Sequence, residues 1–125
     1  AEARAMLSHG KGGSIVNISS TAATRGSAGE WVHYAATKGA MNTMTVGLAA
    51  EVAGEGVRVN AVSPGLTATD LHAEAGEPGR IDRLSSVIPL GRAGTLADVT
   101  QAIEYLLDAS YVTGVNLDIS GGYRL

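Results

Sequence analysis

The sequence predicts an α/β protein with a parallel sheet, because short apolar runs alternate with longer helical stretches. The runs cover residues 13–18, 57–63 and 115–119. A strand that is buried on both faces has nearly continuous apolar residues, which is typical of parallel sheets. Parallel strands also need long crossover connections, and the helical stretches between the runs provide them.

The first elements are a helix over residues 1–8 and the strand that follows it. His9 and Gly10 end the helix, where a histidine cation favours the helix C-terminus. The strand ends in two hydroxyl residues, Ser19 and Ser20. In an open parallel sheet, ligands bind outside the carboxyl ends of the strands. The two serines therefore lie where a site is expected.

The small residues over 21–30 predict a loop after the first strand. The longest predicted helix then covers residues 31–53 and carries Tyr34 and Lys38 near its start. Side chains four residues apart share one helix face. The ordinary pKa of a phenol is about 10, and a nearby ammonium favours the phenolate. Such a pair can exchange a proton with a substrate oxygen. The same spacing also occurs in solvated pairs on ordinary helices.

The second half of the chain continues the alternation of strand and helix. The second strand ends in Pro64 and Gly65, and residues 71–87 predict two short helices broken at 76–79. Thr95 is the expected cap of a helix over 96–107, and Asp98 at its third position gives a near capping box. The last strand follows this helix.

Three motifs in this order resemble those of the short-chain dehydrogenase/reductase family. They are serine at a strand end, Tyr-x-x-x-Lys on the next helix, and Asn-Ala-Val-Ser-Pro-Gly at the end of the next strand. The closing Ser-Gly-Gly is similar to the family's C-terminal turn. Over residues 65–82 the chain is similar to bacterial glucose-dehydrogenase-like oxidoreductases. The resemblance implies the C-terminal half of a Rossmann-like doubly wound parallel sheet, with three strands and helices on both faces.

The resemblance also implies that residues 1–125 form a single partial domain. A complete family member is about twice as long. Its first half carries a glycine-rich turn for the cofactor pyrophosphate and the residue that selects NAD or NADP. No such turn follows a strand in this sequence. The asparagine of the family's catalytic tetrad would also precede Ala1.

The resemblance assigns catalytic roles to Ser20, Tyr34 and Lys38. Serine would polarise the substrate oxygen, tyrosine would transfer the proton, and lysine would lower the tyrosine pKa and hold the nicotinamide ribose. The family's usual serine–tyrosine spacing falls on Thr21, whereas the pattern after Asn-Ile favours Ser20. Ser19 and Thr21 remain alternatives, as does a serine that only caps the strand end.

The cofactor implied by the resemblance is NAD or NADP, with no indication of which. The cofactor-binding residues would be Tyr34, Lys38, Pro64, Gly65, Thr67 and Thr69. Thr69 matches a family threonine that bonds the cofactor, although a Pro-Gly turn is common without any ligand. Residues from about 66 to 88 correspond to a flexible substrate lid.

Composition argues against several other classes of partner. A net charge of −3 and a pI near 5.5 disfavour binding to nucleic acid or to anionic membranes. No apolar run approaches the ~20 residues that span a bilayer. The absence of cysteine is compatible with a cytoplasmic protein. His72 and Glu74 could form a metal pair, but two ligands without a third predict no metal site.

The expected function is that of an NAD(P)-dependent oxidoreductase that interconverts a small-molecule secondary alcohol and a carbonyl by hydride transfer. Small residues along the helix over 31–53 predict a homo-oligomer, a dimer or tetramer. The isolated chain is expected to be inactive and to associate through the unpaired edge of its first strand. The alternative is a truncated, non-catalytic assembly module or relic of the family.

Overall fold

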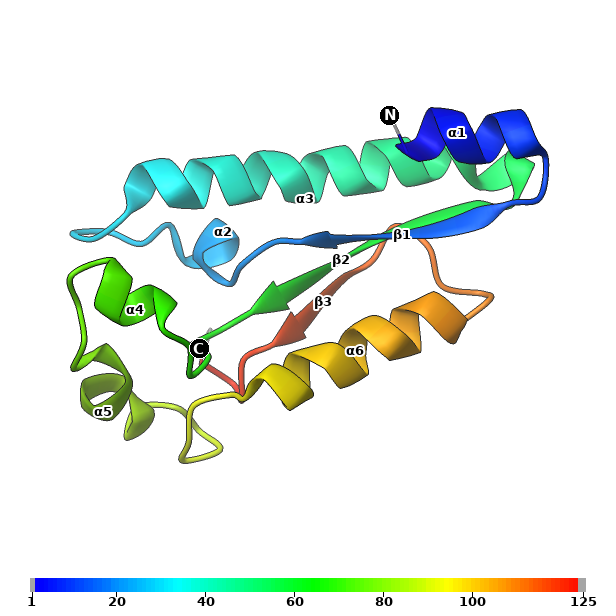
Figure 1. Ribbon diagram of the computed structural model, residues 1–125. Helices are drawn as coiled ribbons and strands as arrows, with labels where there is room; N and C mark the ends of the chain where they lie inside the picture. The colour runs from blue at the N-terminus through cyan, green and yellow to red at the C-terminus, as the bar shows by residue number, and fades with distance from the viewer. Residues whose placement is uncertain (1, 124–125) are drawn as a thin grey trace.

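The computed structural model describes residues 2–123 as a three-stranded parallel sheet with helices on both faces (Figure 1). The strand order is β1-β2-β3. The strands are β1 (Gly13–Ile18), β2 (Val57–Pro64) and β3 (Asn116–Ile119). Helices α1 (Glu2–His9) and α3 (Val32–Val52) cover one face, and α6 (Leu96–Asp108) covers the other. This confirms the predicted α/β class, although Ala1 of the predicted first helix lies outside the described residues.

The segment over residues 21–30, which we expected to be an irregular loop, contains a short helix. Helix α2 spans Ala22–Arg25, so the prediction of a loop there was wrong. The carbonyl of Thr21 accepts the backbone N–H groups of Thr24 and Arg25 at 3.2 and 3.1 Å, which closes one helical turn. Gly26 ends it with a φ of 77°, a conformation that favours glycine.

The remaining short elements agree with the sequence pattern. Helix α3 continues into the 3-10 turn η1 (Ala53–Glu55), and Gly56 follows it in the left-handed region. Helices α4 (Leu71–Glu74) and α5 (Arg80–Ser85) are the two short helices expected on either side of residues 76–79. Figure 1 shows both at the end of the sheet toward which the strand arrows point.

The side chains of β2 alternate between the two faces of the sheet, as a period of two requires. On the α3 face, Val57 and Val59 are fully buried against Ala49 and Val52. Met6 of α1 packs against the same cluster. This small apolar core fixes α1 and α3 on one side of the sheet.

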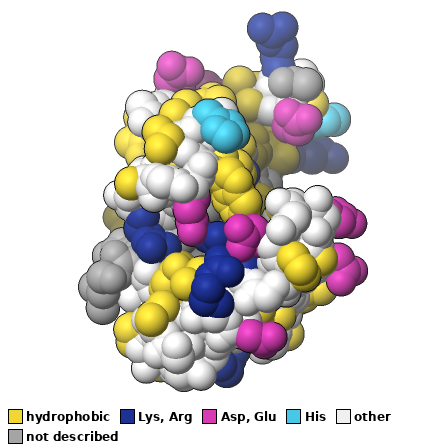
Figure 2. All heavy atoms as spheres, turned by 90° about the vertical axis from the view of Figure 1, so that its left-hand side faces the viewer, with side chains coloured by type: hydrophobic (Ala, Val, Ile, Leu, Met, Phe, Trp, Pro, Cys, Tyr) yellow, Lys and Arg dark blue, Asp and Glu magenta, His cyan; other side chains and the backbone are white. Residues whose placement is uncertain are grey.

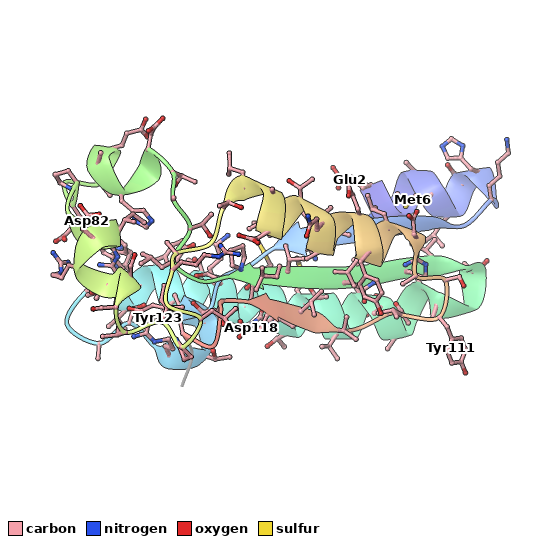
Figure 3. The ribbon with its side chains drawn as sticks, turned by 90° about the horizontal axis from the view of Figure 1, so that it is seen from below. Glu2, Met6, Asp82, Tyr111, Asp118 and Tyr123 are labelled. Carbon is pink, nitrogen blue, oxygen red and sulfur yellow. The ribbon has the colours of Figure 1, made fainter. Side chains whose placement is uncertain are left out.

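On the opposite face, polar side chains of β2 hold α6 and the connection to β3. The guanidinium of Arg58 donates to the carbonyls of Leu106 and Leu107, at 2.7 and 2.6 Å. These are carbonyls of the last turn of α6, which have no partners within the helix. Figure 3 shows α6 lying across this face of the sheet, with α3 on the far side of the sheet.

The start of α6 is fixed by a complete capping box rather than the partial one expected. The N–H of Asp98 donates to Thr95 Oγ1 at 3.2 Å, and the N–H of Thr95 donates to Asp98 Oδ2 at 2.7 Å. Arg92 also donates to both carboxylate oxygens of Asp98. Hydrogen bonds hold the pKa of Asp98 far below its ordinary value. The bond from Arg92 contributes most, and those from Thr95 add to it.

Within residues 2–123, β1 pairs only with β2, so its other edge has no strand partner there. This is the open edge that the sequence predicted.

Among residues 2–123, no helix combines the length and the apolarity needed to cross a bilayer.

We expect Arg58→Met to lower the free energy of unfolding by about 1.5–3 kcal/mol, because two helix carbonyls lose a charged donor. Urea unfolding of the intact protein measures this difference. The matched control is Arg4→Met on the exposed surface of α1, which should change stability by less than about 0.5 kcal/mol. Equal losses in the two variants would contradict this role of Arg58.

Candidate active site

A cavity of about 940 Å³ lies at the carboxyl ends of the strands, between the start of α3 and helices α4 and α5. Its volume falls within the ~300–1,000 Å³ that is usual for small-molecule sites. Figure 2 looks onto this end of the molecule, where acidic and basic side chains gather around the centre. The position agrees with the rule for ligand sites in open parallel sheets.

Every site residue predicted from the sequence lines this one cavity. The set comprises Ser20, Tyr34, Lys38, Pro64, Gly65, Thr67 and Thr69. These residues come from three separate parts of the chain, so the fold brings them together.

The three hydroxyl residues at the end of β1 also line the cavity, but they differ in burial. Ser19 and Thr21 are only 3% and 4% exposed, whereas Ser20 is half-buried. The Ser19 hydroxyl donates to the carbonyl of Lys38 at 3.2 Å. Ser20 Oγ accepts the N–H of Ala22 at 3.1 Å, which leaves its own O–H able to donate to a ligand. Burial and hydrogen bonding therefore favour Ser20 among the three.

Tyr34 and Lys38 lie close together on α3, as their spacing predicts. Lys38 Nζ is 5.6 Å from the centroid of the Tyr34 ring. The same ammonium donates to the carbonyl of Ile18, at the end of β1, at 2.6 Å. This bond holds the positive charge at the junction of strand, helix and cavity.

The end of β2 forms the opposite wall of the cavity. The N–H of Gly65 donates to the carbonyl of Ile119 at 3.0 Å, which brings this turn against the end of β3. A Cβ on Gly65 would lie 2.8 Å from Ser120 Cβ, so glycine is required here by close approach. Thr67 follows, and its carbonyl lies 3.0 Å from Nε2 of His72.

Sequence reasoning missed a cluster on the far wall of the cavity that joins Glu30, Trp31 and Arg80. Arg80 donates to both carboxylate oxygens of Glu30, at 3.0 and 2.6 Å. Its guanidinium lies 4.9 Å from the centroid of the Trp31 ring. The hydrogen bond to Arg80 lowers the pKa of Glu30, and that to Glu30 raises the pKa of Arg80. Because about fifty residues separate the partners, no local pattern could reveal this cluster.

Two further side chains of the wall lie at the C-terminal end of the described chain and in α2. The Arg25 guanidinium lies 4.1 Å from the centroid of the Tyr123 ring. Figure 3 shows Tyr123 near this end of the sheet and Tyr111 at the opposite end, pointing away from the molecule.

Among residues 2–123, no three histidine, aspartate or glutamate side chains form a group that could hold a metal ion.

Comparison with known proteins identifies the family. The family model described as enoyl-(acyl carrier protein) reductase matches residues 1–124. A short-chain type dehydrogenase/reductase from Mycobacterium ulcerans superimposes on 98% of the chain, with a TM-score of 0.85 and 38% identity. The chain belongs to the short-chain dehydrogenase/reductase family. The family resemblance of the sequence and the predicted Rossmann-like fold are thereby confirmed.

Two other proteins are also similar to this chain. The uncharacterized oxidoreductase YgfF of Escherichia coli is 54% identical over 120 residues, which are 94% of this chain and 49% of that protein. The structure described as ElxO with NADP bound has a TM-score of 0.82 and 35% identity, covering 98% of this chain and 50% of the other. The Mycobacterium ulcerans protein is covered over 45% of its length. The chain thus spans about half the length of these relatives.

In this short-chain dehydrogenase/reductase, we expect Gly65→Ala to disturb the contact between the cavity wall and β3. The added methyl group overpacks the turn, which should lower the free energy of unfolding by about 1–3 kcal/mol. Chemical denaturation measures the loss. Gly79→Ala is the control, since a Cβ there meets no atom within 4 Å and its φ is −87°. Wild-type stability in Gly65→Ala would show that the turn can move away from Ser120.

Proposed function

We propose that the protein containing this chain is an NAD(P)-dependent oxidoreductase that interconverts a secondary alcohol and a carbonyl. The observation that carries the proposal is the convergence of Ser20, Tyr34 and Lys38 on one cavity at the carboxyl ends of the strands. Membership of the short-chain dehydrogenase/reductase family supports it. So does the similarity to a structure described with NADP bound.

The nicotinamide end of the cofactor would be held by Tyr34, Lys38, Thr67, Thr69 and the backbone at residues 64–65. The donors in this part of the cavity fit that group, because an ammonium and hydroxyls can bind ribose hydroxyls and a carboxamide. When bound, the nicotinamide supplies or accepts the hydride at the substrate carbon.

The proton would move through Tyr34. In the reducing direction, the phenol O–H bond breaks as an O–H bond forms on the former carbonyl oxygen. Ser20 would donate a hydrogen bond to the same oxygen while negative charge develops there. The Lys38 ammonium stabilises the phenolate that remains, since a nearby positive charge favours the charged form. The phenolate then recovers its proton from solvent.

The same proposal covers access to the site and assembly of subunits. Residues from about 66 to 88 would act as the substrate lid, since His72 of α4 and Arg80 of α5 line the cavity. Three large apolar side chains are more than half exposed on α3, and they suit packing against another copy of the chain: Val32, Met44 and Val46. Residues 1–125 alone would be inactive, because the sequence has no glycine-rich turn to receive a pyrophosphate.

We expect Tyr34→Phe to lower kcat by about 10²- to 10⁴-fold in the intact protein, because the phenol O–H is the proton donor. Steady-state reduction of a carbonyl substrate by NADH or NADPH measures this loss, and circular dichroism checks the fold. Tyr111→Phe, far from the cavity and fully exposed, is the control and should leave kcat unchanged. Turnover of Tyr34→Phe within a few-fold of wild type would rule out proton transfer by this residue.

Lys38→Met should weaken cofactor binding and also lower kcat, because the ammonium serves both the ribose hydroxyls and the phenolate. Calorimetry with NADPH or NADH gives the affinity, and steady-state kinetics give the rate. The matched control is Lys11→Met in the exposed turn before β1. If neither affinity nor rate changes in Lys38→Met, Lys38 has no part in the site.

A further inference from the structure

The cluster of Glu30, Trp31 and Arg80 joins two segments that border the cavity but lie far apart in the sequence. Arg80 is the first residue of α5, within the proposed lid. Glu30 and Trp31 immediately precede α3, the helix that carries Tyr34. All three side chains line the same cavity as Ser20 and Tyr34. A contact within this cluster therefore ties the lid to the segment that leads into the catalytic helix.

The bond between Arg80 and Glu30 has the geometry of a specific contact rather than of a loose surface pair. Nη1 and Nη2 of Arg80 each donate to a different carboxylate oxygen of Glu30, the two-pronged arrangement that only arginine can form. Arg80 is just 8% exposed, which is rare for an arginine unless its charge is paired. Glu30 keeps a side chain that is 41% exposed, so solvent reaches the pair from one side only.

Trp31 makes the contact sensitive to the orientation of the guanidinium. The indole lies 4.9 Å from the guanidinium carbon, within the distance of a cation–π interaction. The guanidinium of Arg80 therefore binds the Glu30 carboxylate along one edge and also lies close to the Trp31 ring. A change at Glu30 or Arg80 therefore also changes the surroundings of the indole.

Backbone hydrogen bonds between Gly94 and residues 66 and 68 fix the base of the lid. Among residues 2–123, the bond from Arg80 to Glu30 is the only ion pair between the lid and the rest of the protein. The two helices of the lid have four and six residues, and Gly76 between them has a φ of 84°. The neighbouring ion pair of Arg83 and Glu77 lies within the lid itself, and both side chains are well exposed. That pair cannot tie the lid to the rest of the protein, which makes it a suitable comparison.

We infer that Glu30 and Arg80 are positioning residues that hold the lid closed over the cavity and fix Trp31 as part of its wall. The catalytic consequence of this inference rests on the proposed oxidoreductase function. Since neither residue takes part in proton transfer, the cluster affects the binding of substrate rather than the chemical step. Its loss should raise KM much more than it lowers kcat.

The test uses Glu30→Gln, Arg80→Gln and the double variant in the intact protein, with Arg83→Gln as the matched control. Trp31 is the one tryptophan among these 125 residues. Fluorine NMR of protein labelled with fluorotryptophan reports on its surroundings, and Trp31→Phe assigns its resonance. Glu30→Gln preserves the shape of a half-exposed side chain, so it gives a folded variant even if Arg80→Gln does not fold.

Each single variant should shift the Trp31 resonance and raise KM several-fold, while kcat changes much less. If the two residues act through one another, the double variant should resemble either single variant, because their effects are not additive. Arg83→Gln should leave both the resonance and KM unchanged. An unmoved Trp31 resonance in Glu30→Gln, or additive effects on KM, would overturn the inference.

The NMR measurement separates this inference from the proposed function. A Trp31 resonance that moves in Glu30→Gln supports the cluster even if Tyr34→Phe retains activity, in which case only the proton-transfer role fails. Conversely, a loss of kcat in Tyr34→Phe together with an unmoved Trp31 resonance supports the reaction and rejects the cluster as a positioning device.

Discussion

The site depends on the parallel pairing of β1 with β2, which places the two strand ends side by side. In the register of this pair, Ile18 lies opposite Val62. The pairing continues past the end of β1, because the N–H of Ser19 donates to the carbonyl of Val62 at 2.7 Å and the N–H of Thr21 donates to that of Pro64 at 3.1 Å. The hydroxyls after β1 and the Pro-Gly turn after β2 therefore meet in one place.

A second set of bonds fixes how α3 sits on this pair of strands. The amide of Asn17 in β1 donates to Thr45 Oγ1 of α3 at 2.9 Å, so it binds the strand to the helix. Toward the site, Ser19 and Lys38 each donate to a carbonyl of the other element. These bonds set the rotation of α3 about its axis, and this rotation directs Tyr34 into the cavity. The buried serine thus supports the helix, while its neighbour Ser20 remains available to a ligand.

Much of this arrangement follows from local sequence. The apolar runs predict the strands, Gly56 marks the end of α3 with its 3-10 extension, and Thr95 with Asp98 predicts the start of α6. These features depend on backbone hydrogen bonds and on residues a few positions apart, so short patterns are enough. The meeting of the candidate site residues in one cavity was also predictable, because parallel strands place their carboxyl ends at one edge of the sheet. The order of motifs along the chain likewise carried the family resemblance that the comparisons confirm.

Only the tertiary structure shows which of the adjacent hydroxyls are buried and which side chains pair along the cavity wall. Ser19, Ser20 and Thr21 are chemically similar neighbours, and their burial depends on how α3 packs over β1. Arg80 could have been a solvated residue of a short helix, but the fold brings it to Glu30 and Trp31 across about fifty residues. Local patterns describe contacts within a helix, a strand or a turn. The remaining contacts require the path of the whole chain, because burial and charge pairing depend on which distant segments meet.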